Sequence, residues 1–183
     1  MTSQRDSLDK FGCLKCHEGK EILAAQTASH LNRQIKATPV LITKRFTQKR
    51  VVRFENRILI PGYVFFKAPP STSYVVCDDT YASYTLLRYD RSNWELLGAD
   101  RSFAEWIISL DGIIGFTKAE KREGRICMID GPLKSVENDI VKVDKKNRNA
   151  LLQMNVLGRE VKIWAGYKYR CTKRLHRVRG MFQ

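Results

Sequence analysis

The chain has 183 residues, enough for one medium domain or two small ones, and its hydrophobic fraction of 43% is ordinary for a folded protein. No run of about 18 apolar residues occurs, and the polar N-terminus lacks the apolar centre of a secretory signal, so we expect a cytoplasmic protein that does not enter a membrane. The net charge of +14 predicts a polyanionic partner, and nucleic acid is favoured because no amphipathic basic helix with a Trp or Leu face stands out.

The first part of the chain alternates strand and helix patterns with short connections. Strands are predicted where apolar residues alternate or run together, and helices where they recur three or four positions apart. Strands or extended segments are expected at 11–17, 40–42, 58–66 (with a kink), 94–97 and 113–117. A first helix lies between the first two strands, with Ile22, Ala25, Ala28, Leu31 and Ile35 on one face, and Pro39 ends it. A second helix is capped by Asp78 and Asp79 and carries Tyr84 and Leu87, and a third is capped by Asp100 and carries Phe103, Trp106, Ile107 and Leu110. This order predicts an α/β sandwich on a mainly antiparallel sheet.

The character of the sequence changes after residue 118. Residues 119–124 are polar and charged and are predicted to form a short linker. Beyond them the helical patterns stop, and five short strand patterns follow, at 125–130, 139–144, 150–156, 160–164 and 167–171. Five short strands in so little chain indicate a small SH3-like or OB-like barrel. Two domains are therefore predicted, at 1–118 and 119–183.

The charge is also unevenly distributed between these two predicted domains. Residues 1–118 carry 17 basic against 12 acidic residues, whereas residues 119–183 carry 16 basic against 7 acidic residues. The net charge is thus +5 in the first and +9 in the second, and the different densities suggest two domains with different tasks.

A short motif near the N-terminus contains two of the five cysteines. Cys13-Leu14-Lys15-Cys16-His17 matches the C-x-x-C-H pattern of c-type haem attachment. The segment reads as a strand, however, where residues three apart point to opposite faces, and a zinc site would lack a second pair of ligands. We therefore expect reduced, buried or half-buried strand thiols and no bound metal.

No pattern of residues indicates catalysis. The three histidines, His17, His30 and His176, lie on different predicted elements without a carboxylate beside them in a motif. Neither a phosphate-binding P-loop nor a dinucleotide-binding glycine motif occurs. The sequence predicts a binding protein with no catalytic residue and no cofactor.

Two segments resemble motifs of a known family. Residues 59–65 read Leu-Ile-Pro-Gly-Tyr-Val-Phe, which resembles the strand motif of the NusG N-terminal (NGN) domain. Residues 124–134, followed by the apolar run at 140–144, resemble a KOW motif, the signature of the NusG C-terminal barrel. The order and spacing of the two motifs match over nearly the whole chain. The resemblance implies an α+β protein, in which an NGN-type α/β sandwich precedes a small SH3-like KOW β-barrel.

A further pattern narrows the resemblance within the NusG family. Residues 103–108 and 111–115 run almost directly into the KOW motif, and in this they are similar to the LoaP-type paralogues, which act as processive antiterminators. One departure is that Phe11-Gly12 stand where NusG proteins usually have Trp-Tyr.

The NGN resemblance implies RNA polymerase as a partner. NGN domains grip the clamp helices of the polymerase with an apolar depression beside the motif strand, which assigns polymerase binding to Pro61, Gly62, Tyr63 and Phe65. Tyr63 and Phe65 would share one face of the sheet, as a groove for a helix requires. The alternative is that these residues are simply part of the hydrophobic core.

A basic stretch precedes this strand. Residues 36–57 hold seven basic residues and one acidic residue, Glu55. An NGN domain seated on the polymerase lies near upstream DNA and the non-template strand, and phosphate contacts there are assigned to Lys44, Arg45, Lys49, Arg50 and Arg53. The alternative is a solvated loop without a ligand.

The KOW resemblance and the local charge of +9 favour RNA as the partner of the barrel. KOW barrels of the LoaP type are associated with a hairpin in leader RNA, and Arg, Lys and Asn contact phosphates and base edges. The residues assigned to RNA binding are Lys134, Lys145, Lys146, Asn147, Arg148, Asn149, Tyr167, Lys168, Arg170, Lys173 and Arg174.

The sequence therefore predicts a monomeric, NusG-like elongation and antitermination factor that promotes processive transcription of long operons. One alternative is a general elongation factor whose KOW domain binds protein partners. Another is a translation-linked KOW protein that binds ribosomal RNA, which the NGN-like half argues against.

Overall fold

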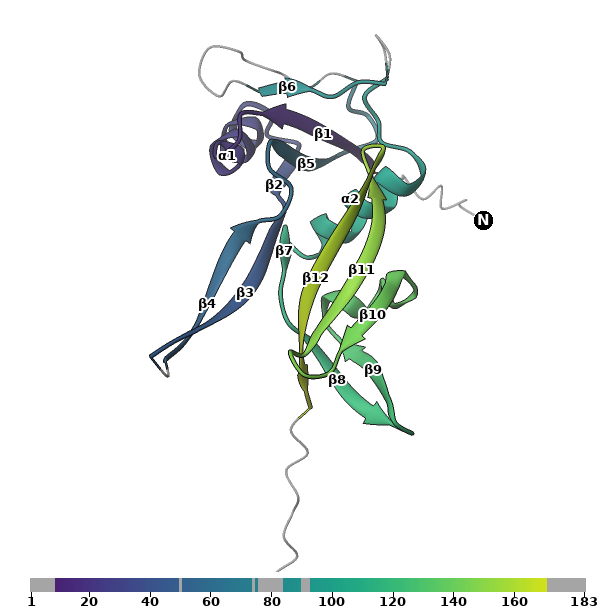
Figure 1. The fold of residues 1–183 in the computed structure, drawn as a ribbon. Coiled ribbons are helices and arrows are strands. Elements are labelled where there is room, and N and C mark those ends of the chain that lie inside the picture. The colour runs from purple at the N-terminus through teal and green to yellow at the C-terminus, as the bar shows by residue number, and fades with distance from the viewer. Residues whose placement is uncertain (1–8, 50, 74, 76–83, 90–92, 171–183) are drawn as a thin grey trace, which may run out of the picture.

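The computed structural model describes residues 9–49, 51–73, 75, 84–89 and 93–170, and its first half is built on a four-stranded antiparallel sheet in the order β2-β5-β1-β6. Two helices and a separate long hairpin accompany this sheet (Figure 1). The elements are β1 (Lys10–Cys16), α1 (Glu21–Leu31), β2 (Lys36–Pro39), β3 (Leu41–Gln48), β4 (Val51–Ile58), β5 (Tyr63–Ala68), β6 (Tyr84–Leu86), α2 (Gly98–Ser109) and β7 (Ile113–Ile114).

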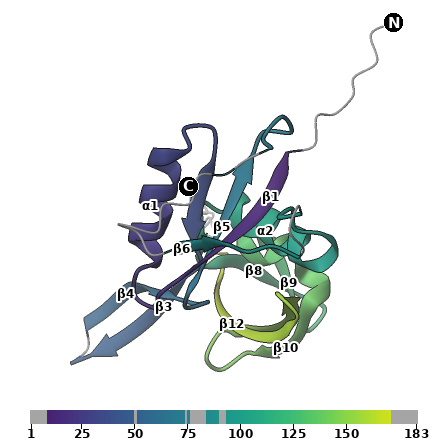
Figure 2. The ribbon, with the colours of Figure 1, turned by 90° about the horizontal axis from the view of Figure 1, so that it is seen from above.

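The two helices cover opposite faces of this sheet (Figure 2). Successive side chains of a strand point to opposite faces, so β1 and β5 each supply both layers. Cys13 and Phe65 belong to the core beneath α2, whereas Leu14 and Phe66 belong to the core beneath α1. The sheet is therefore buried on both sides, and the predicted sandwich is confirmed.

Gly12 makes room in the first sheet for a buried ring of the neighbouring strand. A Cβ atom built on Gly12 would lie 2.2 Å from Cζ of Phe66, the fully buried side chain of the neighbouring strand β5. Only a residue without a side chain leaves room for this ring.

The basic stretch forms a two-stranded hairpin, not a loop. Strands β3 and β4 pair in antiparallel register from Leu41↔Ile58 to Gln48↔Val51, and β3 also pairs in parallel with β7. The hairpin projects from the body of the protein, as Figure 1 shows at the lower left. Exposed β-branched and aromatic residues on β4, such as Val52 and Phe54, explain why this charged segment forms strands.

The second half is a curled five-stranded sheet in the order β10-β11-β12-β8-β9. Neighbouring strands are antiparallel except β12 and β8, which pair in parallel from Tyr167↔Thr117 to Tyr169↔Ala119. The elements are β8 (Thr117–Arg122), β9 (Arg125–Asp130), the 3-10 turns η1 (Pro132–Lys134) and η2 (Glu137–Asp139), β10 (Ile140–Asp144), β11 (Asn149–Val156) and β12 (Arg159–Tyr169). An α+β fold that ends in a small β-barrel is confirmed.

Helix α2 joins the two halves. One continuous hydrophobic cluster runs from the underside of the first sheet through α2 into the barrel. The buried indole Nε1 of Trp106 donates a hydrogen bond to the carbonyl oxygen of Pro132 at 3.0 Å. Asp100 accepts a hydrogen bond from the backbone nitrogen of Leu157, in the β11–β12 turn, at 2.6 Å. The barrel is thus packed on the first half through both apolar and polar contacts.

Several predictions about local structure were wrong. Residues 119–122 are the end of β8 and pair with β9, and Ala119, which is fully buried, also pairs with β12. The segments 160–164 and 167–171 were predicted as two strands, whereas β12 continues through Ala165 and Gly166, both of which are buried.

The predicted helix around Tyr84 is also wrong in its described part. Residues 84–86 form strand β6, which pairs with β1, and Asp78 and Asp79 lie outside the described residues. In α1 the buried residues are Glu21, Ala24, Ala25 and Ala28, so the predicted apolar face is only partly right. Ile22 and Leu31 are exposed, and the alanines of α1 pack in one cluster with Val64 and Phe66. Among the described residues, no helix is long and apolar enough to cross a membrane.

Candidate nucleic-acid interface

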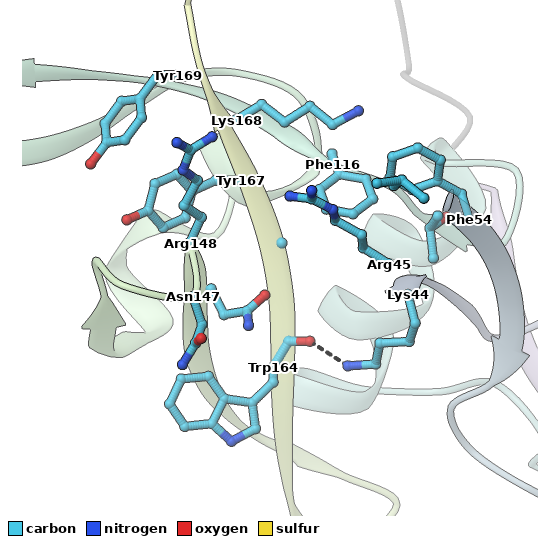
Figure 3. Close-up of a pocket in the computed structure, with 14 residues that line it drawn as sticks. Lys44, Arg45, Phe54, Phe116, Asn147, Arg148, Trp164, Tyr167, Lys168 and Tyr169 are labelled. Atoms are coloured by element: carbon cyan, nitrogen blue, oxygen red, sulfur yellow. Dashed lines mark hydrogen bonds between the residues drawn. The ribbon is translucent and has the colours of Figure 1, made fainter. Parts of the chain in front are cut away.

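The β3–β4 hairpin and the barrel enclose a cleft of about 530 Å³, which we call the hairpin–barrel cleft (Figure 3). Both halves of the chain supply its walls. The hairpin contributes Thr43, Lys44, Arg45, Val52 and Phe54, and the barrel side contributes Phe116, Asn147, Arg148, Asn149, Trp164, Gly166, Tyr167, Lys168 and Tyr169. The register of the hairpin places Arg45 directly opposite Phe54, so a cation and an aromatic ring adjoin on this wall.

The lining of the cleft is electropositive. It contains four cationic side chains, Lys44, Arg45, Arg148 and Lys168, and none of the described lining residues is acidic. Lys44 donates a hydrogen bond from Nζ to the carbonyl oxygen of Trp164 at 2.7 Å. Partial burial, together with the positive charge of Arg57, holds the pKa of Lys44 below its ordinary value. The positive charge in this cleft is therefore not neutralised by its own walls, and a polyanion would stabilise it.

Two phenylalanines and one lysine connect the hairpin to the barrel. Phe54 of the hairpin and Phe116 make an edge-on contact, with ring centroids 5.4 Å apart and an interplanar angle of 83°. Nζ of Lys168 lies 4.6 Å from each of these two ring centroids. A cation held at this distance over aromatic faces makes cation–π contacts. Lys168 is nevertheless exposed, so its charge still faces solvent in the cleft.

The position of Phe116 depends on a glycine in β12. A Cβ atom built on Gly166 would lie 2.3 Å from Cε1 and 2.6 Å from Cδ1 of Phe116. The ring therefore lies directly on the backbone of β12. Since side chains alternate along the strand, Trp164 and Lys168 project on the same face as this contact.

The opposite wall is formed by the β10–β11 turn and the end of β12. The rings of Tyr167 and Tyr169 make an edge-on contact at 5.7 Å, and Cζ of Arg148 lies 5.5 Å from the Tyr169 centroid. The Tyr167 hydroxyl donates to the carbonyl oxygen of Asp144 at 3.4 Å. Burial, followed by the interaction with Tyr169, raises the pKa of Tyr167 to about 12, so this hydroxyl remains a donor at neutral pH.

Asn147 holds the turn that presents Arg148. Its backbone nitrogen and its Nδ2 atom donate to the two carboxylate oxygens of Asp144, at 3.0 Å and 2.7 Å. These bonds lower the pKa of Asp144. Arg148 follows with a φ of 54°, a left-handed conformation that non-glycine residues seldom adopt. The turn is thus fixed by side-chain hydrogen bonds, and part of the hydrogen-bonding capacity of Asn147 is already used.

The cleft unites residues that the sequence analysis assigned to two different ligands. Lys44 and Arg45 were assigned to DNA, yet they face the residues assigned to RNA across one cleft (Figure 3). The RNA-assigned residues that line it are Asn147, Arg148, Asn149, Tyr167 and Lys168.

Other predicted contact residues lie elsewhere. Lys134 is ion-paired with Glu137 at 3.1 Å, and Lys145 donates to the carbonyl oxygen of Gly124 at 3.3 Å. The remaining described residues of the predicted sets are exposed and do not line the cleft: Lys49, Arg53, Lys146 and Arg170. Arg50, Lys173 and Arg174 lie outside the described residues.

The aromatic component of the cleft was missed in the sequence analysis. Phe54, Phe116 and Trp164 were not assigned to any site, although all three line it. The spacing of Val52 and Phe54 in an otherwise charged segment is a strand signal that could have identified the hairpin face. Phe116 could not have been found, because its place depends on the contact with Gly166, 50 positions later in the chain.

The Pro61–Tyr63 turn borders a second, smaller groove of about 300 Å³. One wall consists of Leu59, Ile60, Pro61 and Tyr63, and the other is the β11–β12 turn of the barrel, with Val156, Leu157 and Val161. Tyr63 is half-buried and belongs to the same cluster as Phe65, so the two residues share a sheet face. Phe65 itself is fully buried, with its ring centroid 5.3 Å from that of Phe103 in α2. Its side chain is therefore core in this arrangement and does not reach a partner surface.

A buried carboxylate fixes the turn beside this groove. Glu21 is 1% exposed, and its Oε1 atom accepts hydrogen bonds from the backbone nitrogens of Gly62 at 2.8 Å and Gly19 at 3.1 Å. Burial acts to raise the pKa of Glu21, but these backbone hydrogen bonds outweigh it and the pKa is lowered. Gly62 has a φ of 79°, which only glycine adopts without strain. Glu21 and Gly62 together determine how Pro61 is presented.

The two cysteines of the C-x-x-C-H segment lie on opposite faces of β1, as predicted. Cys13 is fully buried beneath α2, and Cys16 is half-buried beside the cluster that packs under α1. Burial raises the pKa of both thiols. Within the described part of the chain, no group of three or more His, Cys, Asp or Glu side chains is placed to hold a metal ion.

Comparisons with known proteins give little beyond the fold itself. No protein family model and no curated protein matches this sequence. Among solved structures, the chain is similar to NusG of Thermotoga maritima, in a structure described by its domain interaction, with 16% identity and a TM-score of 0.42 over 87% of this chain and 94% of that chain.

Proposed function

We propose that this chain is a NusG-like transcription factor that binds RNA polymerase through its first half and nucleic acid through the hairpin–barrel cleft. Riding on the polymerase, it promotes processive transcription and opposes termination, in the manner of the LoaP-type paralogues. The observation that carries the proposal is the cleft itself, because four uncompensated cations beside exposed aromatic rings form a surface suited to nucleic acid.

The polymerase contact is assigned to the groove beside the Pro61–Tyr63 turn. Pro61 is exposed and Tyr63 is half-buried, so both reach the surface, and the NGN resemblance of residues 59–65 connects this surface with the clamp helices. Leu59 and Ile60 add the apolar wall that an amphipathic helix needs. Because Phe65 is buried, it supports the groove from below and does not make the contact itself.

The polymerase contact can be tested by co-elution of the full chain with purified core RNA polymerase. Tyr63→Ala should weaken co-elution, because the side chain forms part of the groove wall. Tyr169→Ala is the matched control, since it removes an exposed tyrosine that lines the hairpin–barrel cleft and not this groove, and it should leave co-elution unchanged. Equal co-elution of the wild type and Tyr63→Ala would contradict the assignment of this groove.

Transcription through terminators distinguishes a leader-specific antiterminator from a general elongation factor. A LoaP-type factor should increase readthrough only on templates that encode its leader RNA hairpin. Equal stimulation on templates with and without the leader would instead support a general elongation factor whose barrel binds protein partners.

A further inference from the structure

We propose that the hairpin–barrel cleft is one binding site for a single unpaired polynucleotide strand, held jointly by the hairpin and the barrel. This inference deepens the proposed function and rests on it for the polyanionic nature of the ligand. It replaces two separate sites, DNA on the hairpin and RNA on the barrel, by one composite site.

The hairpin wall and the barrel wall of the cleft contact each other directly. Lys168 of the barrel lies over the Phe54 ring of the hairpin at 4.6 Å, and Lys44 of the hairpin donates to the Trp164 carbonyl oxygen of the barrel at 2.7 Å. Figure 3 shows these side chains converging from the two sides. A polynucleotide strand in the cleft therefore meets cations from both walls at once. A ligand that binds the β3–β4 hairpin there also contacts the barrel.

Exposed aromatic rings in the cleft indicate the kind of polyanion that it binds. Phe54, Trp164 and Tyr169 line the cleft and are 50%, 38% and 38% exposed. Exposed aromatic faces bind unpaired bases by stacking, whereas the base faces of a regular duplex are covered by their neighbours. An acidic peptide would use the cations, but its carboxylates do not stack on aromatic rings, whereas every unpaired nucleotide carries a base that does. Alternating cations and rings thus favour a single-stranded polynucleotide.

Each wall of the cleft pairs a guanidinium group with an aromatic ring. Arg45 adjoins Phe54 on the hairpin wall, and Arg148 lies over Tyr169 on the barrel wall. Each wall therefore offers a guanidinium group for a phosphate next to a ring for a base. The stacking contact does not require a particular base, so this site gives affinity and leaves sequence preference to other contacts.

The test measures binding of the full chain to fluorescein-labelled oligouridylate of about 12 nucleotides, a length suited to barrel-type single-strand sites. Arg45→Ala on the hairpin and Lys168→Ala on the barrel should each weaken the same oligonucleotide and each lower the slope of log affinity against log salt by about 0.7. Phe54→Leu keeps the apolar volume but removes the ring, and should weaken binding about five- to a hundredfold.

Lys162→Ala is the matched control for charge. Lys162 is an exposed lysine of the same strand β12, is ion-paired with Glu160 at 3.3 Å and does not line the cleft. It should leave binding nearly unchanged, and circular dichroism should show every variant to be folded. An unchanged affinity of Arg45→Ala for oligouridylate, or a loss with Lys162→Ala equal to that with Lys168→Ala, would overturn the composite site.

Two further ligands complete the test. A duplex of the same length should bind more weakly than the single strand, and equal binding would also overturn the inference. Oligothymidylate identifies the natural strand, because tighter binding of oligouridylate assigns RNA and the reverse order assigns DNA. Lys168→Ala should still co-elute with core polymerase. Failure of the wild type to co-elute would overturn the proposed function. The oligonucleotide measurements would still test the composite binding site independently of polymerase binding.

Discussion

The ammonium group of Lys168 lies 4.6 Å from the ring centroid of Phe54, a residue 114 positions earlier in the chain. Phe54 belongs to the hairpin of the first half and Lys168 to the last strand of the barrel, so this contact joins the two halves at the surface as α2 joins them in the core. Its consequence is that the hairpin and the barrel present one continuous basic and aromatic surface, whose elements can be tested separately.

Gly166→Ala should disturb the cleft through sterics alone. The added methyl group would approach the Phe116 ring to 2.3 Å, so the ring must move and its contacts with Phe54 and Lys168 weaken. We expect a loss of about 1–3 kcal/mol in the free energy of unfolding and weaker oligonucleotide binding. Gly115→Ala, next to Phe116, has nothing within 4 Å of the added atom and should be close to neutral. Equal effects of the two substitutions on binding would contradict this account.

Glu21→Gln should destabilise the protein in a pH-dependent way. The folded state lowers the Glu21 pKa, so its carboxylate contributes stability above the unfolded pKa of about 4.3 and loses it as the pH falls through the lower folded value. Loss of the charged acceptor for Gly62 and Gly19 should cost about 1–3 kcal/mol at neutral pH. Urea unfolding of the wild type and the variant should show this difference shrinking below about pH 4.3. A difference that is constant with pH would mean that the charge of Glu21 does not matter.

Asp100→Ala should weaken the packing of the barrel on the first half. One carboxylate oxygen accepts from the Leu157 backbone nitrogen at 2.6 Å, and the other accepts from the Tyr89 hydroxyl at 2.8 Å. Loss of hydrogen bonds to a charged acceptor should cost about 1–3 kcal/mol in thermal or urea unfolding. Glu105→Ala, on the same helix, removes only a surface ion pair with Arg101 and should cost less than about 1 kcal/mol. If Asp100→Ala is no more destabilising than this control, the contact does not hold the halves together.

The general fold was predictable from the sequence because it depends on local patterns. A short apolar run bounded by turn residues identified β9 with its observed bounds, and three- and four-residue spacing identified the buried face of α2 around Phe103, Trp106 and Ile107. The cap of α2 was misplaced, since the helix begins at Gly98 and Asp100 lies inside its first turn. There Asp100 binds the barrel, a tertiary contact that no local pattern reveals.

The site was only partly predictable, for a similar reason. The cations Lys44, Arg45, Arg148 and Lys168 stand out by composition, and the structure brings them together. Their separation into a DNA set and an RNA set followed the two predicted domains, and no local pattern indicates the packing that places one set beside the other. Phe65 was assigned to polymerase binding but is fully buried, because an aromatic residue in a motif can belong to the core as readily as to a binding surface.

The central claim is that one strand contacts both walls of the cleft, and site-specific photocrosslinking in a polymerase elongation complex tests it most directly. A photoreactive uridine is placed in the emerging RNA or, in a parallel complex, a photoreactive deoxyuridine in the non-template DNA, and adducts on this chain are mapped by mass spectrometry. The account predicts that a single one of these strands forms adducts both on the β3–β4 hairpin, at or near Phe54, and on β12, at or near Trp164 and Tyr169. Adducts of DNA confined to the hairpin together with adducts of RNA confined to the barrel would contradict it.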